Sequence, residues 1–135
     1  MQRARATGAV AGFPEPVLRE DLREVDYGDY EGLTSAQIHT TNPGWRLYRD
    51  GSPNGETPDQ IYQRAQRFLD QAVAGAGADD NVLAFSHGHF IRALAVAFLE
   101  LGIIHAGQLG LDTASITVLQ EGPGGRLLQV WNSTV

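Results

Sequence analysis

The feature that most constrains the fold of this chain is a long apolar stretch from Asn81 to Gly102, NVLAFSHGHFIRALAVAFLELG. Residues 81–86 form a short apolar run without helical periodicity, which predicts a strand buried on both faces. From His89 the stretch is rich in Ala, Leu and Phe and reaches Gly102, which predicts a helix with a glycine after its last turn. We therefore expect a buried strand that passes directly into a helix.

His87 and Gly88 lie at the turn between the predicted strand and helix. In open α/β sheets ligands collect at such corners, because free backbone N–H groups and the helix dipole attract anions. A histidine there can add a positive charge or a proton near neutral pH. Arg92, one turn further on, either adds a second positive charge or only braces a loop carboxylate. A turn histidine satisfied by neighbouring backbone is the structural alternative, but we favour a functional His87 that helps to bind a phosphoryl group.

Length and composition limit the possible functions. The chain has 135 residues, which suits one domain, 1–135, with a real core. Its formal net charge of -6 argues against nonspecific nucleic-acid binding, so any phosphate site must be a local positive pocket. No apolar run is long enough to cross a bilayer, so we expect no membrane partner. The absence of cysteine and of a signal-peptide pattern leads us to expect a cytoplasmic protein without disulfides or thiolate metal sites.

Two segments carry helix start signals. Thr34-Ser35-Ala36-Gln37 fits a capping box and predicts a short helix that ends before Pro43. Thr57-Pro58-Asp59-Gln60 is a second capping box, and the helix after it should cover one face of the sheet with an apolar stripe. The predicted stripe consists of Ile61, Ala65, Phe68, Leu69, Ala72 and Val73. Between these helices, residues 44–56 read as an ordered loop, and residues 1–12 read as a further helix.

A loop rich in acidic and aromatic residues spans positions 20–31. Glu24 and Asp26 are its candidate proton donors, because burial beside aromatic rings would raise a carboxyl pKa into a useful range. His105, in a later loop, is interpreted as a surface or capping residue. Residues 115–119 and 127–131 flank a glycine-rich turn and predict an antiparallel hairpin at the sheet edge, in which Ile116 and Val118 alternate with polar neighbours.

Four segments in order, LREVDYGDYEGLT, GSPNGETPDQ, VLAFSHGHFIRAL and LDTASITVL, resemble the histidine phosphatase superfamily, which has the phosphoglycerate-mutase-like fold. The acid or broad-specificity phosphatase branch is the most similar. The resemblance implies a three-layer α/β/α fold whose sheet is mostly parallel, with an antiparallel C-terminal edge. It also implies that Arg3, in QRARAT, grips phosphate, that Glu24 is the general acid, and that His87 flanks the phosphoryl group. Gly88 and His89 would line the pocket.

The resemblance has one departure. The family nucleophile is a histidine in an Arg-His-Gly motif after the first strand, and this chain contains no such motif. We therefore expect an N-terminally truncated domain that lacks its first strand, and an exposed sheet edge that could favour a homodimer. In a complete family member the nucleophile would form a phosphohistidine while Glu24 protonates the leaving alcohol, without a metal or other cofactor.

These implications lead to one functional expectation with open alternatives. We expect phosphomonoester hydrolysis by the full-length parent, acting on a small phosphorylated metabolite, with impaired turnover in this chain. A non-catalytic remnant that binds phosphate ligands and phosphoglycerate mutase activity remain open alternatives. A metal site on His87 and His89 is disfavoured, because residues two apart across a helix start do not share a face.

Overall fold

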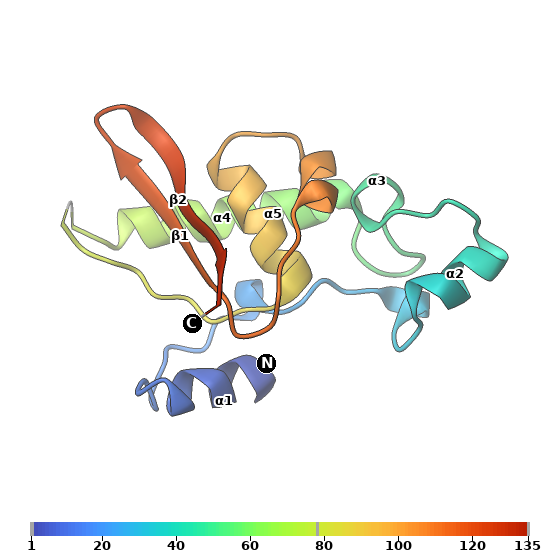
Figure 1. The fold of residues 1–135 in the computed structure, drawn as a ribbon, viewed down its shortest axis with the longest axis horizontal. Helices are drawn as coiled ribbons and strands as arrows, with labels where there is room; N and C mark the ends of the chain where they lie inside the picture. Colours follow the sequence, from blue (N-terminus) through green and yellow to red (C-terminus); the bar gives the residue numbers. More distant parts are fainter. Residues whose placement is uncertain (1, 78, 135) are drawn as a thin grey trace.

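The computed structural model describes residues 2–77 and 79–134, and Figure 1 shows a set of helices beside one antiparallel hairpin. The elements, with η for a 3-10 helix, are α1 (Gln2–Val10), η1 (Glu20–Leu22), η2 (Gly28–Tyr30), α2 (Ser35–Thr41), α3 (Leu47–Asp50), α4 (Pro58–Ala74), α5 (Gly88–Phe98), η3 (Ile103–Gln108), β1 (Ile116–Gly122) and β2 (Gly125–Ser133). Within the described ranges, β1 and β2 form the only sheet.

The two predicted capping boxes begin α2 and α4. The Thr34 hydroxyl accepts the Gln37 backbone N–H at 3.2 Å, and the Gln37 side chain accepts the Thr34 N–H at 2.8 Å. Thr57 and Gln60 make the same reciprocal pair at 3.2 and 2.9 Å, with Pro58 at the first helical position. Both helix starts are confirmed, because capping satisfies backbone N–H groups with residues that are adjacent in the sequence.

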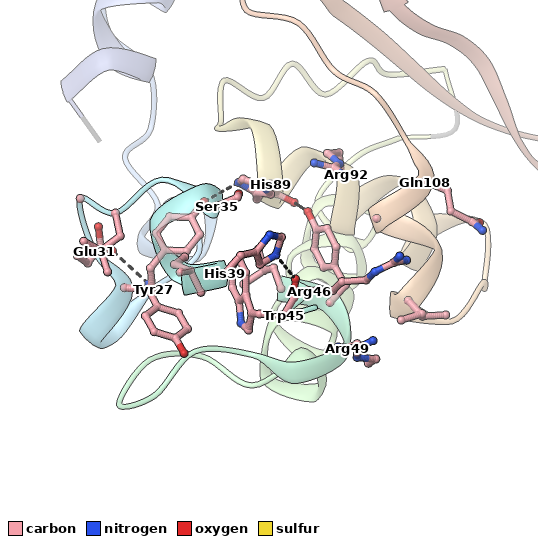
Figure 2. A pocket seen from close by; sticks show the side chains of 18 residues that line it. Tyr27, Glu31, Ser35, His39, Trp45, Arg46, Arg49, His89, Arg92 and Gln108 are labelled. Atoms are coloured by element: carbon pink, nitrogen blue, oxygen red, sulfur yellow. Dashed lines mark hydrogen bonds between the residues drawn. The ribbon is translucent and has the colours of Figure 1, made fainter. Parts of the chain in front are cut away.

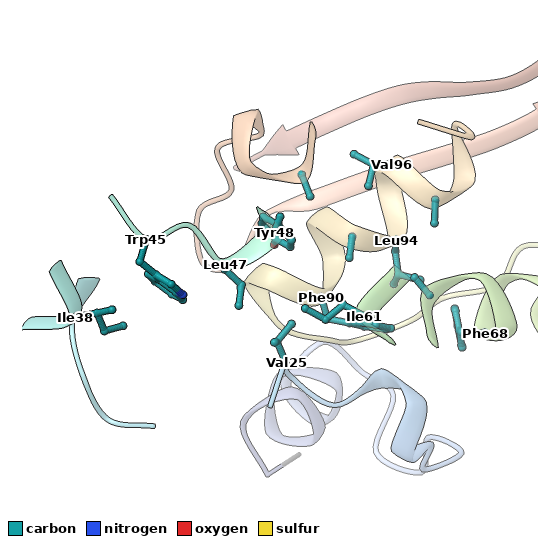
Figure 3. Packing of buried hydrophobic residues seen from close by; sticks show 14 residues of the cluster. Val25, Ile38, Trp45, Leu47, Tyr48, Ile61, Phe68, Phe90, Leu94 and Val96 are labelled. Atoms are coloured by element: carbon teal, nitrogen blue, oxygen red, sulfur yellow. The ribbon is translucent and has the colours of Figure 1, made fainter. Parts of the chain in front are cut away.

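The core forms where α4 packs against α5, and Figure 3 shows its side chains together. Phe90 of α5 and Ile61 of α4 are both 0% exposed. The apolar face of α4 is therefore directed at α5, and the prediction that it covers a sheet is wrong. Val73, which was predicted on this face, is 50% exposed near the end of the helix.

Residues 81–86 form an extended segment without strand pairing, so the prediction of a buried strand is wrong. Val82 and Leu83 are 56% and 60% exposed. A parallel strand needs neighbours that take its N–H and C=O groups and cover both faces. Among the described residues the only strands are those of the hairpin, so the implied mostly parallel sheet is not formed by this part of the chain.

Helix α5 begins at Gly88, one residue before the predicted start at His89, and it ends earlier than predicted. His87 is its N-cap residue and Phe98 its last residue, so Gly102 is not the stop signal. Glu100 takes a positive φ of 59°. The N–H of Glu100 bonds to the Ala97 carbonyl at 3.1 Å, and the N–H of Leu101 bonds to the Val96 carbonyl at 2.9 Å. This is a Schellman motif with glutamate in the position that glycine usually occupies.

The hairpin and the loop before α4 complete the fold. Strands β1 and β2 pair antiparallel, which confirms the predicted C-terminal hairpin. Ile116 and Val118, however, are 52% and 39% exposed. Residues 44–56, predicted as a loop, contain α3, which buries Leu47 and Tyr48. No helix in the part of the chain that the structure describes is long and apolar enough to cross a membrane.

Candidate functional site

Glu24 caps the amino end of α5 from a distant part of the sequence. Its Oε1 accepts the backbone N–H of Phe90 at 3.1 Å and that of Val25 at 2.9 Å, and its Oε2 accepts the His89 N–H at a weaker 3.4 Å. His87, the N-cap residue, makes no side-chain cap of its own. Two α5 amides that the sequence predicts to be free for a phosphoryl group are therefore bonded to Glu24, whose negative charge the helix dipole favours.

His87 brings an unsatisfied nitrogen to this corner. Its Nε2 is buried and makes no hydrogen bond to any residue that the structure describes. Burial lowers the pKa of His87, the charge of Glu24 opposes this by raising it, and the charge of Arg3 lowers it further. A buried polar atom without a partner costs free energy, so the unsatisfied Nε2 distinguishes His87 from a histidine that is only structural.

Arg3 of α1 acts on His87 through its charge. That charge lowers the pKa of the imidazole, so the two side chains lie within electrostatic range of each other. Gly8 packs closely against Phe85, two residues before His87, because a Cβ there would lie a tight 3.2 Å from the Phe85 ring. Gly88 is the first residue of α5, and a Cβ built on it meets nothing within 4 Å. The space next to the Gly88 α-carbon is therefore open.

His89 has a different set of partners. The Tyr27 hydroxyl lies 2.5 Å from its Nδ1, and the Tyr48 hydroxyl donates to its backbone carbonyl at 2.7 Å. Burial raises the pKa of Tyr27 and lowers that of His89, so it favours the neutral form of both groups. The hydroxyl and Nδ1 share one hydrogen bond, in which the tyrosine donates when the imidazole proton lies on Nε2.

A cavity of about 580 Å³ opens beside His89 (Figure 2). Aromatic and basic side chains dominate its wall: Tyr27, Tyr30, Trp45, Tyr48, His39, His89, Arg46, Arg49 and Arg92. Arg92 donates its Nε–H to the Ala106 carbonyl at 2.8 Å, and its guanidinium lies 5.3 Å from the Tyr48 ring. Arg92 therefore bonds to a backbone carbonyl of η3, and not to a loop carboxylate as one of the two sequence-based interpretations had it. It also lines the cavity. This is a local basic pocket on an acidic chain.

Asp26, the other predicted proton donor, fastens its loop. Its Oδ1 accepts the Gly28 N–H at 3.0 Å. Its backbone N–H donates to Glu56 Oε2 at 2.9 Å, and its carbonyl accepts the Glu56 N–H at 2.9 Å. Glu24, in contrast, lies with its Oε2 3.9 Å from His89 Nδ1. Of the two carboxylates, Glu24 is the one that the fold brings to the histidines.

Two contributors were missed in the sequence. Tyr27 belongs to the aromatic and glycine alternation of the acidic loop, but nothing there indicates that its hydroxyl meets His89. Arg64 lies at the i+3 position after Ile61, on the buried face of α4, and is only 6% exposed. The sequence did contain one indication of a buried role for Arg64, because it is a basic residue on the apolar side of an amphipathic helix. His105 is exposed and bonds to Gln108, as predicted for a surface residue.

No cluster of three or more His, Asp or Glu side chains that could hold a metal ion occurs within residues 2–77 and 79–134.

Comparison with known proteins gives consistent matches. The family model described as histidine phosphatase superfamily (branch 1) matches residues 1–134. An acid phosphatase of Mycobacterium tuberculosis is 35% identical over 133 residues, which are 98% of this chain and 65% of that protein. A glucosyl-3-phosphoglycerate phosphatase of the same species is 34% identical over 141 residues, covering 87% of this chain and 63% of its own length. This chain thus spans less than two thirds of either relative.

Solved structures agree with the sequence matches. The structure of an open reading frame product from Mycobacterium tuberculosis has a TM-score of 0.93 at 34% identity and covers 98% of this chain and 68% of its own. A mycobacterial glucosyl-3-phosphoglycerate phosphatase in complex with inorganic phosphate has a TM-score of 0.79 at 32% identity and covers 98% of this chain and 73% of its own. These matches show the phosphoglycerate-mutase-like α/β fold. The chain belongs to the histidine phosphatase superfamily, branch 1.

Proposed function

We propose that residues 1–135 act as one domain in which Glu24, His87 and Arg3 form the phosphoryl site of a phosphomonoesterase. The observation that carries this proposal is the buried, unpartnered Nε2 of His87, in an imidazole whose pKa responds to the charges of both Glu24 and Arg3. A tetrahedral dianion would accept a hydrogen bond from that nitrogen and lie close to two basic groups. The phosphatase relatives support this assignment.

The proposed hydrolysis has two displacement steps. A histidine of the complete enzyme attacks phosphorus in line, so that the P–N bond forms as the P–O bond breaks, and Glu24 gives its proton to the leaving alkoxide. Water then attacks phosphorus and passes a proton to Glu24, and the P–N bond breaks to release phosphate. Arg3 and His87 offset the charge on the phosphoryl oxygens. The Oε2 atom of Glu24, held only by a 3.4 Å contact, is the oxygen best placed to carry the proton.

We propose further that this chain by itself does not form the phosphohistidine. Three of its four histidines are engaged by other groups. His39 bonds to a backbone carbonyl at 2.9 Å, His105 to a glutamine at 3.0 Å, and His89 to a tyrosine. His87 keeps an unbonded nitrogen, but by family resemblance it takes the flanking position and not that of the nucleophile.

The cavity beside His89 is the proposed site for the alcohol portion of the substrate. Its aromatic wall suits a sugar ring, and Arg46 and Arg92 could pair with a second acidic group. Two relatives are named for sedoheptulose 1,7-bisphosphate and glucosyl-3-phosphoglycerate. We therefore propose a sugar phosphate that carries a second acidic group as the substrate class.

Calorimetry with phosphate and vanadate tests the phosphoryl site. The wild-type chain is expected to bind both anions, and His87→Ala to weaken binding about tenfold or more, since a hydrogen bond to a charged group is lost. His105→Ala, which alters an exposed histidine, is the matched control. A wild-type chain that binds neither anion would refute the site.

Hydrolysis of p-nitrophenyl phosphate in the presence of EDTA tests turnover. We expect none from the 135-residue chain and metal-independent turnover from a longer protein that contains it. Turnover by the short chain that His87→Ala abolishes would contradict our account of the nucleophile. Anion binding without hydrolysis by the longer protein would favour the non-catalytic binding remnant.

A homodimer is part of the proposal. Val82 and Leu83 form an exposed apolar surface on the unpaired segment, which a second copy could cover. Light scattering coupled to size exclusion measures the mass directly. A monomer at high concentration would remove this part of the proposal.

A further inference from the structure

Arg64 uses all of its donors on groups around Glu24. Its Nε–H and one Nη2–H donate to the two oxygens of Glu56, at 2.7 and 2.8 Å. Its Nη1 donates to the backbone carbonyls of Asp21 and Arg23, both at 2.9 Å, and Nη2 also reaches the Glu24 carbonyl at 3.5 Å. A guanidinium has five N–H donors in a fixed plane, so this one is fully committed.

The same guanidinium lies against the first turn of α5. Its carbon is 3.9 Å from the centroid of the Phe90 ring, and the Phe90 side chain is 0% exposed. The backbone N–H of Phe90 is the group that Glu24 Oε1 accepts at 3.1 Å. Arg64 therefore contacts both partners of this hydrogen bond: the loop that carries the Glu24 carboxylate, and Phe90, whose N–H donates to it.

Glu56 extends this arrangement along the acidic loop. Its Oε2 also accepts the Asp26 N–H at 2.9 Å, next to the segment that places Tyr27 against His89. The side chains of Arg64 and Glu56 are 7% and 11% exposed, so water competes little for these bonds. A lysine at position 64 would keep the charge but could not join five acceptors in one plane.

We propose that Arg64 is a positioning residue, which holds the Glu24 carboxylate at the amino end of α5 by fixing the backbone of residues 21–24 and the Phe90 ring together. This inference rests on the proposed function, in which Glu24 transfers the proton, and it adds the group that decides where that proton donor lies. Arg64 acts only through Glu24 and does not contact the phosphoryl group.

The test compares Arg64→Lys with Arg67→Lys, an exposed arginine on the same helix. The NMR titrations of His87 and His89 report where the Glu24 charge lies, because that charge raises both midpoints. If Arg64→Lys releases the carboxylate, both midpoints should fall by about half a pH unit or more, and the amide signals of His89 and Phe90 should shift. Arg67→Lys should change neither.

A double-mutant comparison separates positioning from general loosening of the fold. The Glu24→Gln variant already lacks the carboxylate. Adding Arg64→Lys to it should therefore leave both histidine midpoints at the values measured for Glu24→Gln alone. Unchanged midpoints in the single Arg64→Lys variant, or an equal further fall in the Glu24→Gln background, would overturn the proposal. If Arg64→Lys does not fold, Phe90→Leu takes its place, because it removes the ring under the guanidinium and should move the midpoints in the same direction by less. No shift in Phe90→Leu would then overturn the proposal.

Failure of this inference is distinct from failure of the proposed function. Wild-type binding of phosphate and vanadate with unmoved histidine midpoints would leave the phosphoryl site standing and reject Arg64. If the histidine midpoints move as expected but the chain binds neither anion, the positioning role of Arg64 stands and the phosphoryl site is rejected.

Discussion

Substitution of Gly28 tests how closely the loop that carries Glu24 packs against residues 53–56. Gly28 has a positive φ of 50°, and a Cβ there would lie 2.1 Å from the Pro53 carbonyl oxygen, about 1.3 Å inside the ordinary contact distance of 3.4 Å. In Gly28→Ala the turn around Pro53 has to move away. We expect that movement to break both the 2.9 Å bond from the Asp29 N–H to Pro53 and the 2.9 Å bond from the Glu56 N–H to Asp26.

Gly32→Ala is the matched control. Gly32 also has a positive φ, 76°, but a Cβ on it meets nothing within 4 Å. Both alanines pay the left-handed backbone cost of about 1 kcal/mol, and the effect on the unfolded chain is the same in both. Two lost hydrogen bonds at about 1 kcal/mol each should therefore separate the variants by about 2 kcal/mol.

Urea unfolding followed by circular dichroism measures this difference, and calorimetry with vanadate follows the site. We expect Gly28→Ala to lose about 3 kcal/mol of unfolding free energy in total and to bind vanadate more weakly, because Glu24 and Tyr27 lie on the displaced loop. Gly32→Ala should lose about 1 kcal/mol and bind normally. Equal stability of the two variants would refute the steric argument.

Three further predictions follow from the site and the helix caps. Burial lowers the pKa of both His87 and His89, so the unfolded chain binds more protons than the folded one near and below pH 6.5, and the melting temperature should fall as the pH falls below that value. Added sulfate should restore part of the lost melting temperature. A melting temperature that does not change with pH in this range would contradict the prediction. Tyr27→Phe tests whether the tyrosine donates to Nδ1, which would stabilise neutral His89: we expect the NMR titration midpoint of His89 to rise toward 6.5, and an unchanged midpoint would show that the hydroxyl is not the donor. Thr57→Ala should lower the unfolding free energy by about 1 kcal/mol, measured beside Gln63→Ala at an exposed position of the same helix, and equal losses in both would argue against the capping box.

Predictions from the sequence succeeded where the determining contacts are local. The capping boxes at Thr34 and Thr57 depend on residues three positions apart, the start of α5 lies within a residue of the predicted His89, and the C-terminal hairpin forms around a short turn at Gly122–Gly125. The family could be recognised because its motifs follow one another in order along the chain. The strand at residues 81–86 failed because an apolar run specifies a buried strand only if other strands come to lie beside it.

The sequence by itself determined the helix boundaries that are set by caps, the hairpin and the family. Only the tertiary structure decided that Glu24 accepts the backbone N–H groups at the start of α5, that Tyr27 hydrogen-bonds to His89, and that Arg64 joins the acidic loop to Phe90. Each of these contacts joins residues more than 20 positions apart. Their physical basis is burial. Within the fold, water no longer hydrogen-bonds to these carboxylates, hydroxyls and guanidinium groups, so each of them bonds to a group on another element. The periodicity of one segment does not identify that distant group.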